Sequence, residues 1–195
     1  MLTLSQTVDL LGRRLLDPWE DEAPAEGRRQ AAVALMLKET GGGPELLLIK
    51  RAHNPRDHWS GHMALPGGRR EQTDATLAHT AIRETREEVG VHVPESHVLG
   101  RLDTIRPANP KLPPIDITPY VALAPEGAVV VHREREVAAH FWVPVEHLRR
   151  TGPSAIYSLD WGGVRNEFPA YPLDEHLIWG LTERILSTFL LLTTP

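Results

Sequence analysis

The sequence predicts a mixed α/β fold, an α/β/α sandwich with a mixed β-sheet, on three observations. Short apolar runs that are typical of buried strands come before and after one central amphipathic helix. A strongly apolar segment at residues 177–192 predicts a C-terminal helix. The 195 residues suffice for one compact domain with a substantial core, whereas a doubly wound parallel sheet would need more helices.

The expected strands begin with a hairpin. Residues 31–37 and 46–50 are short apolar runs, and residues 38–44 between them form a Gly-rich turn. Residues 51–68 are rich in Arg, His, Pro and Gly and are expected to be irregular. Proline-rich loops separate the remaining strands, which are expected at residues 98–105, 117–123 and 141–143.

Two helices are expected ahead of the C-terminal one. A helix over residues 3–16 is predicted by apolar side chains at helical spacing, namely Leu4, Val8, Leu11 and Leu15. The central helix is expected over residues 74–89, because Gly90 is a natural C-cap. We assign residues 1–29 to the N-terminal helix and its connecting loop, and residues 30–195 to the main domain, which includes the C-terminal helix.

Composition and charge exclude several classes of protein. The net charge is −5 and the pI is near 6.1, so the chain lacks the basic surface that duplex nucleic acid requires. It has no cysteine, and any metal must therefore be held by oxygen or nitrogen. The longest apolar tract, residues 189–192, is too short to span a bilayer, and no charged leader precedes an apolar stretch. We expect a soluble, cytoplasmic protein without a membrane partner.

The central helix carries three closely spaced carboxylates. Glu84, Glu87 and Glu88 occupy positions i, i+3 and i+4, which places them within one turn. Hard oxygen ligands in this arrangement suit Mg²⁺ or Mn²⁺. The alternative is a solvated charged face on which Arg83 and Arg86 neutralise the glutamates. A separate face of the helix is expected to be buried, through Ala78, Ile82, Thr85 and Val89.

The segment ahead of the helix favours the metal site over the solvated face. Residues 66–70 read Pro-Gly-Gly-Arg-Arg, and a Gly-Gly pair allows bare backbone to approach a ligand or to present a carbonyl to a metal. Asp74 then leads into the helix. A Gly-Gly loop, a loop acid, Arg-Glu, Glu-Glu and Gly in this order form a specific combination.

This combination resembles the motif of the Nudix hydrolases. That motif reads Gly, five residues, Glu, seven residues, Arg-Glu, an apolar residue, any residue, Glu-Glu, any residue, Gly and an apolar residue. Here it runs from Gly68 to Val91. Asp74 stands in place of Glu, eight residues rather than seven separate it from Arg83, and Thr85 replaces the usual aliphatic residue.

The resemblance implies an enzyme that splits a pyrophosphate linkage with the help of Mg²⁺ or Mn²⁺. It implies that Arg83 orients the glutamates and that Glu87 takes part in catalysis. The role of Asp74 is the one that the two departures leave open. The implied metal ligands are Glu84, Glu87, Glu88 and the carbonyl of Gly68.

A further acid from a later loop often completes such sites. Glu136 is the preferred candidate, because it shortly precedes the apolar residues 141–143, and Glu134 is the reserve. The alternative is that residues 132–136, His-Arg-Glu-Arg-Glu, form only a solvated loop of mixed charge.

The substrate expectation comes from residues upstream of the Gly-Gly pair. Residues 47–56, followed by Gly61 and residues 65–68, look like the extra motif of the coenzyme A pyrophosphatase branch. That branch also tends to use Asp and one more residue before Arg-Glu. Leu65, in place of the usual Phe, and a longer interval before Gly61 depart from it. Several fixed cations are needed to bind coenzyme A, and we expect Arg51, Arg56 and Arg69 to contact the substrate.

Other functions remain open on the sequence alone. Within the same superfamily, the substrate could be ADP-ribose, a dinucleotide or an oxidised nucleotide. A non-catalytic nucleotide-sensing module would keep the fold, but would be expected to lose acids from the Arg-Glu-x-x-Glu-Glu core. A small-molecule nucleotide is the expected partner in each case. The apolar N-terminal helix could supply either an intrachain contact or a dimer contact, and we expect a homodimer.

Overall fold

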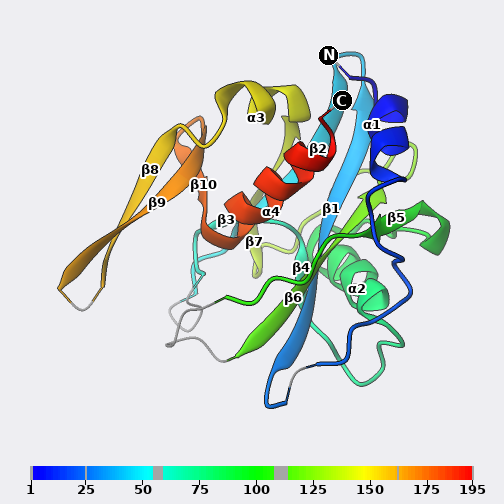
Figure 1. Ribbon diagram of the computed structural model, residues 1–195, viewed down its shortest axis with the longest axis horizontal. Coiled ribbons are helices and arrows are strands. Elements are labelled where there is room, and N and C mark those ends of the chain that lie inside the picture. The colour runs from blue at the N-terminus through cyan, green and yellow to red at the C-terminus, as the bar shows by residue number, and fades with distance from the viewer. Residues whose placement is uncertain (1, 25, 55–58, 108–113, 162, 195) are drawn as a thin grey trace.

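The computed structural model describes residues 2–24, 26–54, 59–107, 114–161 and 163–194. A seven-stranded mixed sheet forms its centre, with the strand order β3-β2-β1-β6-β5, and β4 pairs with β1 while β7 pairs with β2 (Figure 1). Only the β1–β6 pair is parallel within this described sheet. The strands are β1 (Arg29–Thr40), β2 (Gly43–Arg51), β3 (Met63–Ala64), β4 (Gly67–Arg69), β5 (Val98–Arg101), β6 (Ile115–Leu123) and β7 (Val137–Pro144).

The predicted hairpin is confirmed and is longer than its apolar runs. Strands β1 and β2 pair in antiparallel register from Leu37 opposite Leu46 to Thr40 opposite Gly43. Gly43 has a φ of 95°, which a glycine adopts at little cost and which permits the tight turn. The first two strands of the sheet are therefore paired by a turn that the local sequence encodes.

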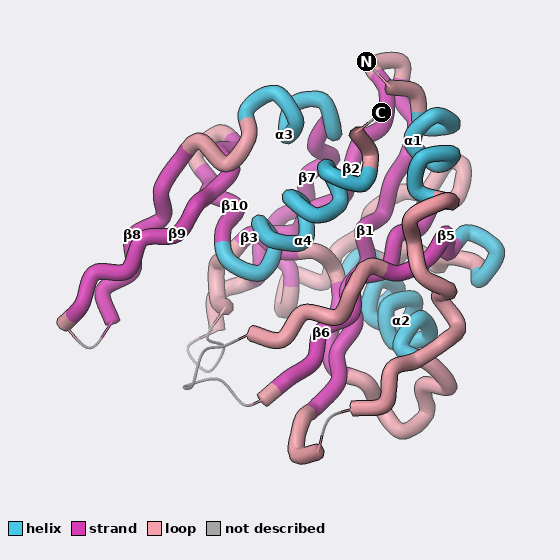
Figure 2. The backbone as a smooth tube through the Cα atoms, in the orientation of Figure 1, coloured by secondary structure: helices cyan, strands magenta, loops and turns pink. Residues whose placement is uncertain are grey.

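Helices cover both faces of the sheet, as the predicted sandwich requires (Figure 2). Leu35, Leu37 and other alternate residues pack with α4 residues such as Phe189, whereas Met36 packs on the opposite side with Val89 of α2. Successive strand residues point to opposite faces, so one apolar run supplies both halves of the core. The helices are α1 (Leu4–Leu11), α2 (Leu77–Val89), α3 (Val145–Thr151) and α4 (Gly180–Leu192), with a short 3₁₀ helix at Glu95–His97.

The ends of α2 are set by their capping residues. Thr76 is the N-cap and its side chain accepts a hydrogen bond from the His79 amide, so the helix begins after Asp74 and not at it. Gly90 ends the helix in the left-handed conformation, at a φ of 71°, as predicted. Asp74 is thereby left in the preceding loop.

Two further expectations about where helices begin and end were wrong. Helix α1 stops at Leu11, with Gly12 as its C-cap, and Leu16 instead forms a β-bridge with Arg101. Residues 177–179 belong to strand β10, and α4 begins only at Gly180. An apolar run looks alike in a buried strand and in a buried helix, which explains the second error.

A second sheet was missed by the sequence reading. Its three antiparallel strands are β8 (Ala155–Trp161), β9 (Val164–Leu173) and β10 (His176–Trp179), in the order β10-β9-β8. Strands β8 and β9 form a ribbon that projects from the body of the molecule (Figure 1). None of the described helices is long and apolar enough to cross a membrane.

Candidate active site

The carboxylates of α2 lie beside strand β4, which carries the Gly-Gly pair. The Glu88 side chain is only 6% exposed, and its Oε2 accepts a hydrogen bond of 2.9 Å from the Gly67 amide. Glu84 lies directly against Gly68. Glu87 is more open to solvent, with 42% of its side chain exposed. The burial of Glu88 differs from the expectation that all three carboxylates would lie away from the buried face, because the helix turns this residue toward the sheet.

Both glycines are required by close approaches. A Cβ atom on Gly67 would lie 2.6 Å from the Cα atom of Val33, and the backbone there has a φ of 155°. A Cβ atom on Gly68 would lie 2.7 Å from Oε2 of Glu84. Gly67 is therefore needed for strand packing, whereas Gly68 leaves room for a carboxylate.

These two contacts predict different effects of the same substitution. Gly67→Ala is expected to lower the free energy of unfolding by more than about 2 kcal/mol, because backbone atoms cannot move aside. Gly68→Ala is expected to cost less than about 1 kcal/mol, because only the end of a flexible side chain must move, yet to weaken divalent-metal affinity about tenfold by displacing the Glu84 carboxylate. Chemical denaturation of both variants measures the change in unfolding free energy, and Mn²⁺ titration measures the change in metal affinity. Unchanged Mn²⁺ affinity in Gly68→Ala would remove Glu84 from the proposed metal ligands.

Arg83 connects the loop acid to the helix carboxylates. Its Nε and Nη2 atoms donate to the two carboxylate oxygens of Asp74, each at 3.0 Å. Its Nη1 atom donates to Glu84 at 2.9 Å and to Glu87 at 3.4 Å, and Nη2 also donates to the carbonyl of Arg69 at 2.9 Å. Asp74 thus fixes the guanidinium, and the guanidinium fixes the glutamates.

Burial controls the electrostatics of these acids. Burial raises the pKa of Glu88 to about 7, against the lowering effects of the Gly67 amide and Arg51, and the charges of Glu84 and Glu136 raise it further. Burial likewise raises the pKa of Glu84. Two partly desolvated, mutually repelling carboxylates form a site that a cation would stabilise.

Asp74 behaves in the opposite way. Burial acts to raise its pKa, but hydrogen bonds from Arg83, the Glu71 amide and Thr80, with the positive charge of Arg83, hold the pKa below its ordinary value of 3.8. Asp74 is therefore ionised at neutral pH and committed to holding Arg83.

Glu136 lies in a loop that contacts the end of α2. Its charge contributes to the raised pKa of Glu88, and its own carboxylate pairs with Arg135 at 2.8 Å. The backbone of its loop is tied to the end of α2, since the Arg133 amide donates to the carbonyl of Glu88 at 3.0 Å. Glu134 is exposed and stays the reserve candidate.

The residue set fits a divalent cation in its chemistry. Glu84 and Glu88 supply hard oxygen ligands next to the Gly67–Gly68 backbone, and both carry raised pKa values that a bound cation would reverse. Among the described residues, no three acidic or histidine side chains are already arranged as a complete ligand set. Substrate phosphates and water would have to supply the remaining ligands, as is usual for Mg²⁺.

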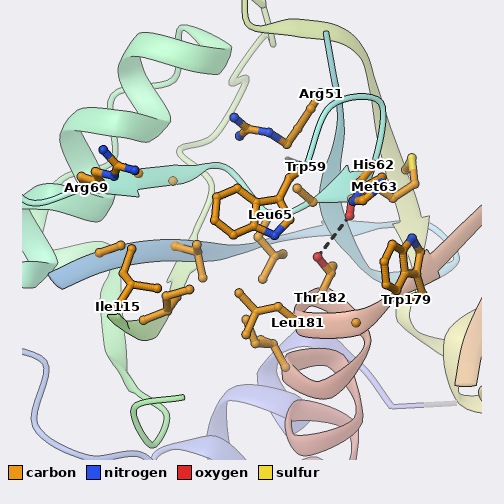
Figure 3. A pocket seen from close by; sticks show the side chains of 18 residues that line it. Arg51, Trp59, His62, Met63, Leu65, Arg69, Ile115, Trp179, Leu181 and Thr182 are labelled. Atoms are coloured by element: carbon orange, nitrogen blue, oxygen red, sulfur yellow. Dashed lines mark hydrogen bonds between the residues drawn. The ribbon is translucent and has the colours of Figure 1, made fainter. Parts of the chain in front are cut away.

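A largely apolar groove of about 350 Å³ opens beside these residues. Figure 3 shows Arg51 and Arg69 at its upper and left margins, with Trp59 above Leu65 at its centre. Arg51 also approaches Glu88, at 3.7 Å. Arg56 lies outside the described residues, so its predicted substrate contact is left without a structural position.

The sequence reading assigned no substrate contact to the residues that form the far wall of the groove. Trp179, Leu181 and Thr182 line it, and the Thr182 hydroxyl donates to the carbonyl of Met63 at 3.1 Å (Figure 3). The Trp179 ring stacks on Tyr157 of β8, with centroids 3.9 Å apart. Residues 178–182 look like the same coenzyme A pyrophosphatase branch, but their position at the groove was not predicted, because the pairing of β10 with β9 and the start of α4 bring them to the site.

A family model described as the NUDIX domain matches residues 27–161. The chain belongs to the Nudix family. It is 34% identical over 170 residues to the mitochondrial coenzyme A diphosphatase NUDT8 of Homo sapiens, which covers 85% of this chain and 70% of that protein. It is 31% identical over 186 residues, 95% of both chains, to the uncharacterized Nudix hydrolase NudL of Photorhabdus laumondii.

The Nudix fold is also shared with solved structures. A MutT/nudix family protein from Enterococcus faecalis matches 95% of this chain and 67% of its own, with a TM-score of 0.57 and 17% identity. The predicted α/β sandwich is thereby confirmed, and the chain is a Nudix pyrophosphohydrolase. Members of this family generally use divalent metal ions.

Proposed function

We propose that this Nudix enzyme hydrolyses coenzyme A to 3′,5′-ADP and 4′-phosphopantetheine with Mg²⁺ or Mn²⁺. The observation that carries the proposal is the apolar groove lined by Arg51, Arg69 and the Gly67–Gly68 pair, whose glycines contact the α2 carboxylates. The printed name of the human relative, a coenzyme A diphosphatase, supports the same substrate.

The chemistry of coenzyme A matches the two halves of this site. Its diphosphate needs cations, which Arg51, Arg69 and a divalent ion would provide. The pantetheine arm that follows carries a gem-dimethyl group and several methylenes, and these groups suit the apolar groove walls formed by Leu65, Leu181 and Ile185. A groove of about 350 Å³ accepts a segment of the arm of this size.

The residues would divide the reaction as follows. Glu84, Glu87 and Glu88, with the carbonyl of Gly68, would hold the divalent ion. When bound, the ion would neutralise phosphoryl charge and lower the pKa of a water molecule. Arg83 keeps the glutamates in place, and Asp74 positions Arg83.

Glu136 is the proposed general base. It would accept a proton from the water that attacks phosphorus, and the P–O–P linkage would break with the other phosphate as the leaving group. Its charge acts on Glu88 and its side chain is only partly exposed, which suits a group that must reach the reacting water.

An assay against a panel of diphosphate compounds tests the substrate. Coenzyme A, ADP-ribose, a dinucleotide and an oxidised nucleoside triphosphate are incubated with and without Mg²⁺, and products are identified by mass spectrometry. We expect coenzyme A to be turned over with the highest kcat/KM and to yield the two products named above. Efficient hydrolysis of ADP-ribose or a dinucleotide, with none of coenzyme A, would contradict the proposal.

Two exposed arginines provide a matched pair for the same assay. Arg69 lines the groove, whereas Arg86 lies on the exposed face of α2. Arg69→Gln is expected to raise KM for coenzyme A about tenfold through loss of a charge-assisted contact, and Arg86→Gln is expected to leave this KM unchanged.

The cytoplasmic location and the homodimer expected from the sequence remain predictions.

A further inference from the structure

The segment that leads from α1 into β1 lies against the start of α2 (Figure 2). The carboxylate of Asp21 accepts hydrogen bonds of 3.0 and 3.2 Å from the Leu77 amide, the first N–H of the helix. The ring of Trp19 packs on His79, with centroids 5.5 Å apart. An amide in the first turn has no partner within its own helix, so a residue distant in sequence supplies it here. Both residues precede the region that the family model matches, 27–161.

Asp21 also reaches the loop that contains Asp74. It pairs with Nη1 of Arg70 at 3.0 Å, and Nη2 of Arg70 donates to the carbonyls of Asp74 and Ala75 at 3.4 and 2.9 Å. Asp74 in turn holds Arg83 with two hydrogen bonds. A continuous set of polar contacts therefore runs from Asp21 to the residue that orients the glutamates.

The segment that carries Asp21 is itself fixed to the sheet. Arg101 of β5 is 8% exposed, and its Nε atom donates to the carbonyls of Asp17 and Glu20 at 3.2 and 3.1 Å. Its backbone exchanges two hydrogen bonds of 3.0 Å with Leu16. The segment that carries Asp21 is thus anchored to strand β5 of the sheet.

We propose that Asp21, acting with Arg70, is a positioning residue for the metal site of this enzyme. Its negative charge lies at the positive end of the α2 dipole and fixes both the first turn of the helix and the loop of Asp74. Without it, Arg83 loses its defined position, and the carboxylates of α2 lose the arrangement that a cation needs. The proposal rests on the metal-binding role proposed for those carboxylates.

The test compares Asp21→Asn and Asp21→Ala with Glu22→Gln. Glu22→Gln is the matched control, because it removes the same charge from the same segment. Glu22 pairs with Arg101 and Arg106 rather than with α2 or the loop before it. Two readouts are measured without substrate: the Kd of Mn²⁺ by titration with electron paramagnetic resonance, and amide hydrogen exchange of residues 74–80 in the metal-free protein. Neither depends on which diphosphate compound the enzyme hydrolyses.

We expect both Asp21 variants to raise the Kd of Mn²⁺ about threefold to tenfold. Exchange of residues 74–80 is expected to rise at least about fivefold in Asp21→Ala, where the bond to the Leu77 amide is lost, and less in Asp21→Asn. Glu22→Gln is expected to change neither the Kd of Mn²⁺ nor the exchange of residues 74–80. Equal effects of Glu22→Gln and Asp21→Asn on the Kd, or an unchanged Kd in both Asp21 variants, would overturn the proposal.

Discussion

Glu88→Gln is expected to lower kcat/KM by about 10²- to 10³-fold while making the metal-free protein more stable at pH 8. Activity falls because the amide cannot replace a charged ligand next to the Gly67–Gly68 backbone. Stability rises because a charge that is costly to bury is removed, while the Gln carbonyl can still accept the hydrogen bond from the Gly67 amide.

The stability effect follows from the pKa of Glu88, which burial raises from 4.5 to about 7. The folded protein holds this proton more tightly than the unfolded chain, so wild-type stability falls as pH rises from about 4.5 to about 7, and the loss is complete above that. A rise of this size in the pKa of Glu88 corresponds to about 3 kcal/mol. The variant lacks the carboxyl group, so its advantage should be largest at pH 8 and vanish toward pH 4.5.

Urea denaturation at pH 5, 6, 7 and 8 in the presence of a chelator measures this effect. Glu87→Gln is the control on the same helix, because its side chain is 42% exposed and its removal should change stability little. A Glu88→Gln protein that hydrolyses its substrate at the wild-type rate would exclude Glu88 as a metal ligand. A variant less stable than wild type at pH 8 would contradict the unfavourable burial of the charge.

Arg83→Gln is expected to lower the free energy of unfolding by about 2–4 kcal/mol at pH 7 and to abolish most activity. The substitution leaves the Asp74 carboxylate, 5% exposed, buried without its cationic partner. Arg83→Lys keeps the charge but cannot donate two parallel hydrogen bonds, so it should recover only part of the loss. Thermal and chemical denaturation, with assays at high Mn²⁺, measure both effects.

The pH dependence identifies the cause of the Arg83 effect. In the wild-type protein the pKa of Asp74 lies below 3.8, so its ion pair contributes stability above that pH and loses it as the pH falls further. In Arg83→Gln, burial raises the pKa of Asp74 without the opposing effect of the guanidinium, so the buried carboxylate is expected to take up a proton as the pH falls from 7 toward 4. The difference in unfolding free energy between wild type and this variant should therefore narrow over that range. Arg86→Gln, which removes the same charge from the exposed face of α2, should stay within about 0.5 kcal/mol of wild type. A gap that is constant with pH would assign the loss to packing rather than to Asp74.

The parts of the fold and site that the sequence predicted are those encoded by local signals. The β1–β2 hairpin follows from a Gly-rich turn between two apolar runs, and the end of α2 follows from Gly90. The proximity of Gly68 and Glu84 was expected from the motif, because β4 leads through one short loop into α2. These features depend on residues that are near one another in sequence.

The parts that were missed depend on long-range packing. Spacing in the sequence does not reveal that Glu88 is turned toward the sheet and buried, since that requires the position of α2 on β1 and β4. The contacts of Asp21 with Leu77 and Arg70 join residues 56 and 49 positions apart, and no local pattern marks such a pair. The strand–helix boundary at Gly180 was missed because both elements are apolar.

A crystal structure of the protein with Mn²⁺, using anomalous scattering at the manganese edge, tests the proposed metal site most directly. The predicted result is an anomalous peak within coordination distance of the Glu84 and Glu88 carboxylates and next to the carbonyl of Gly68. Peaks only elsewhere on the protein, with Glu88 still bonded to the Gly67 amide, would contradict it.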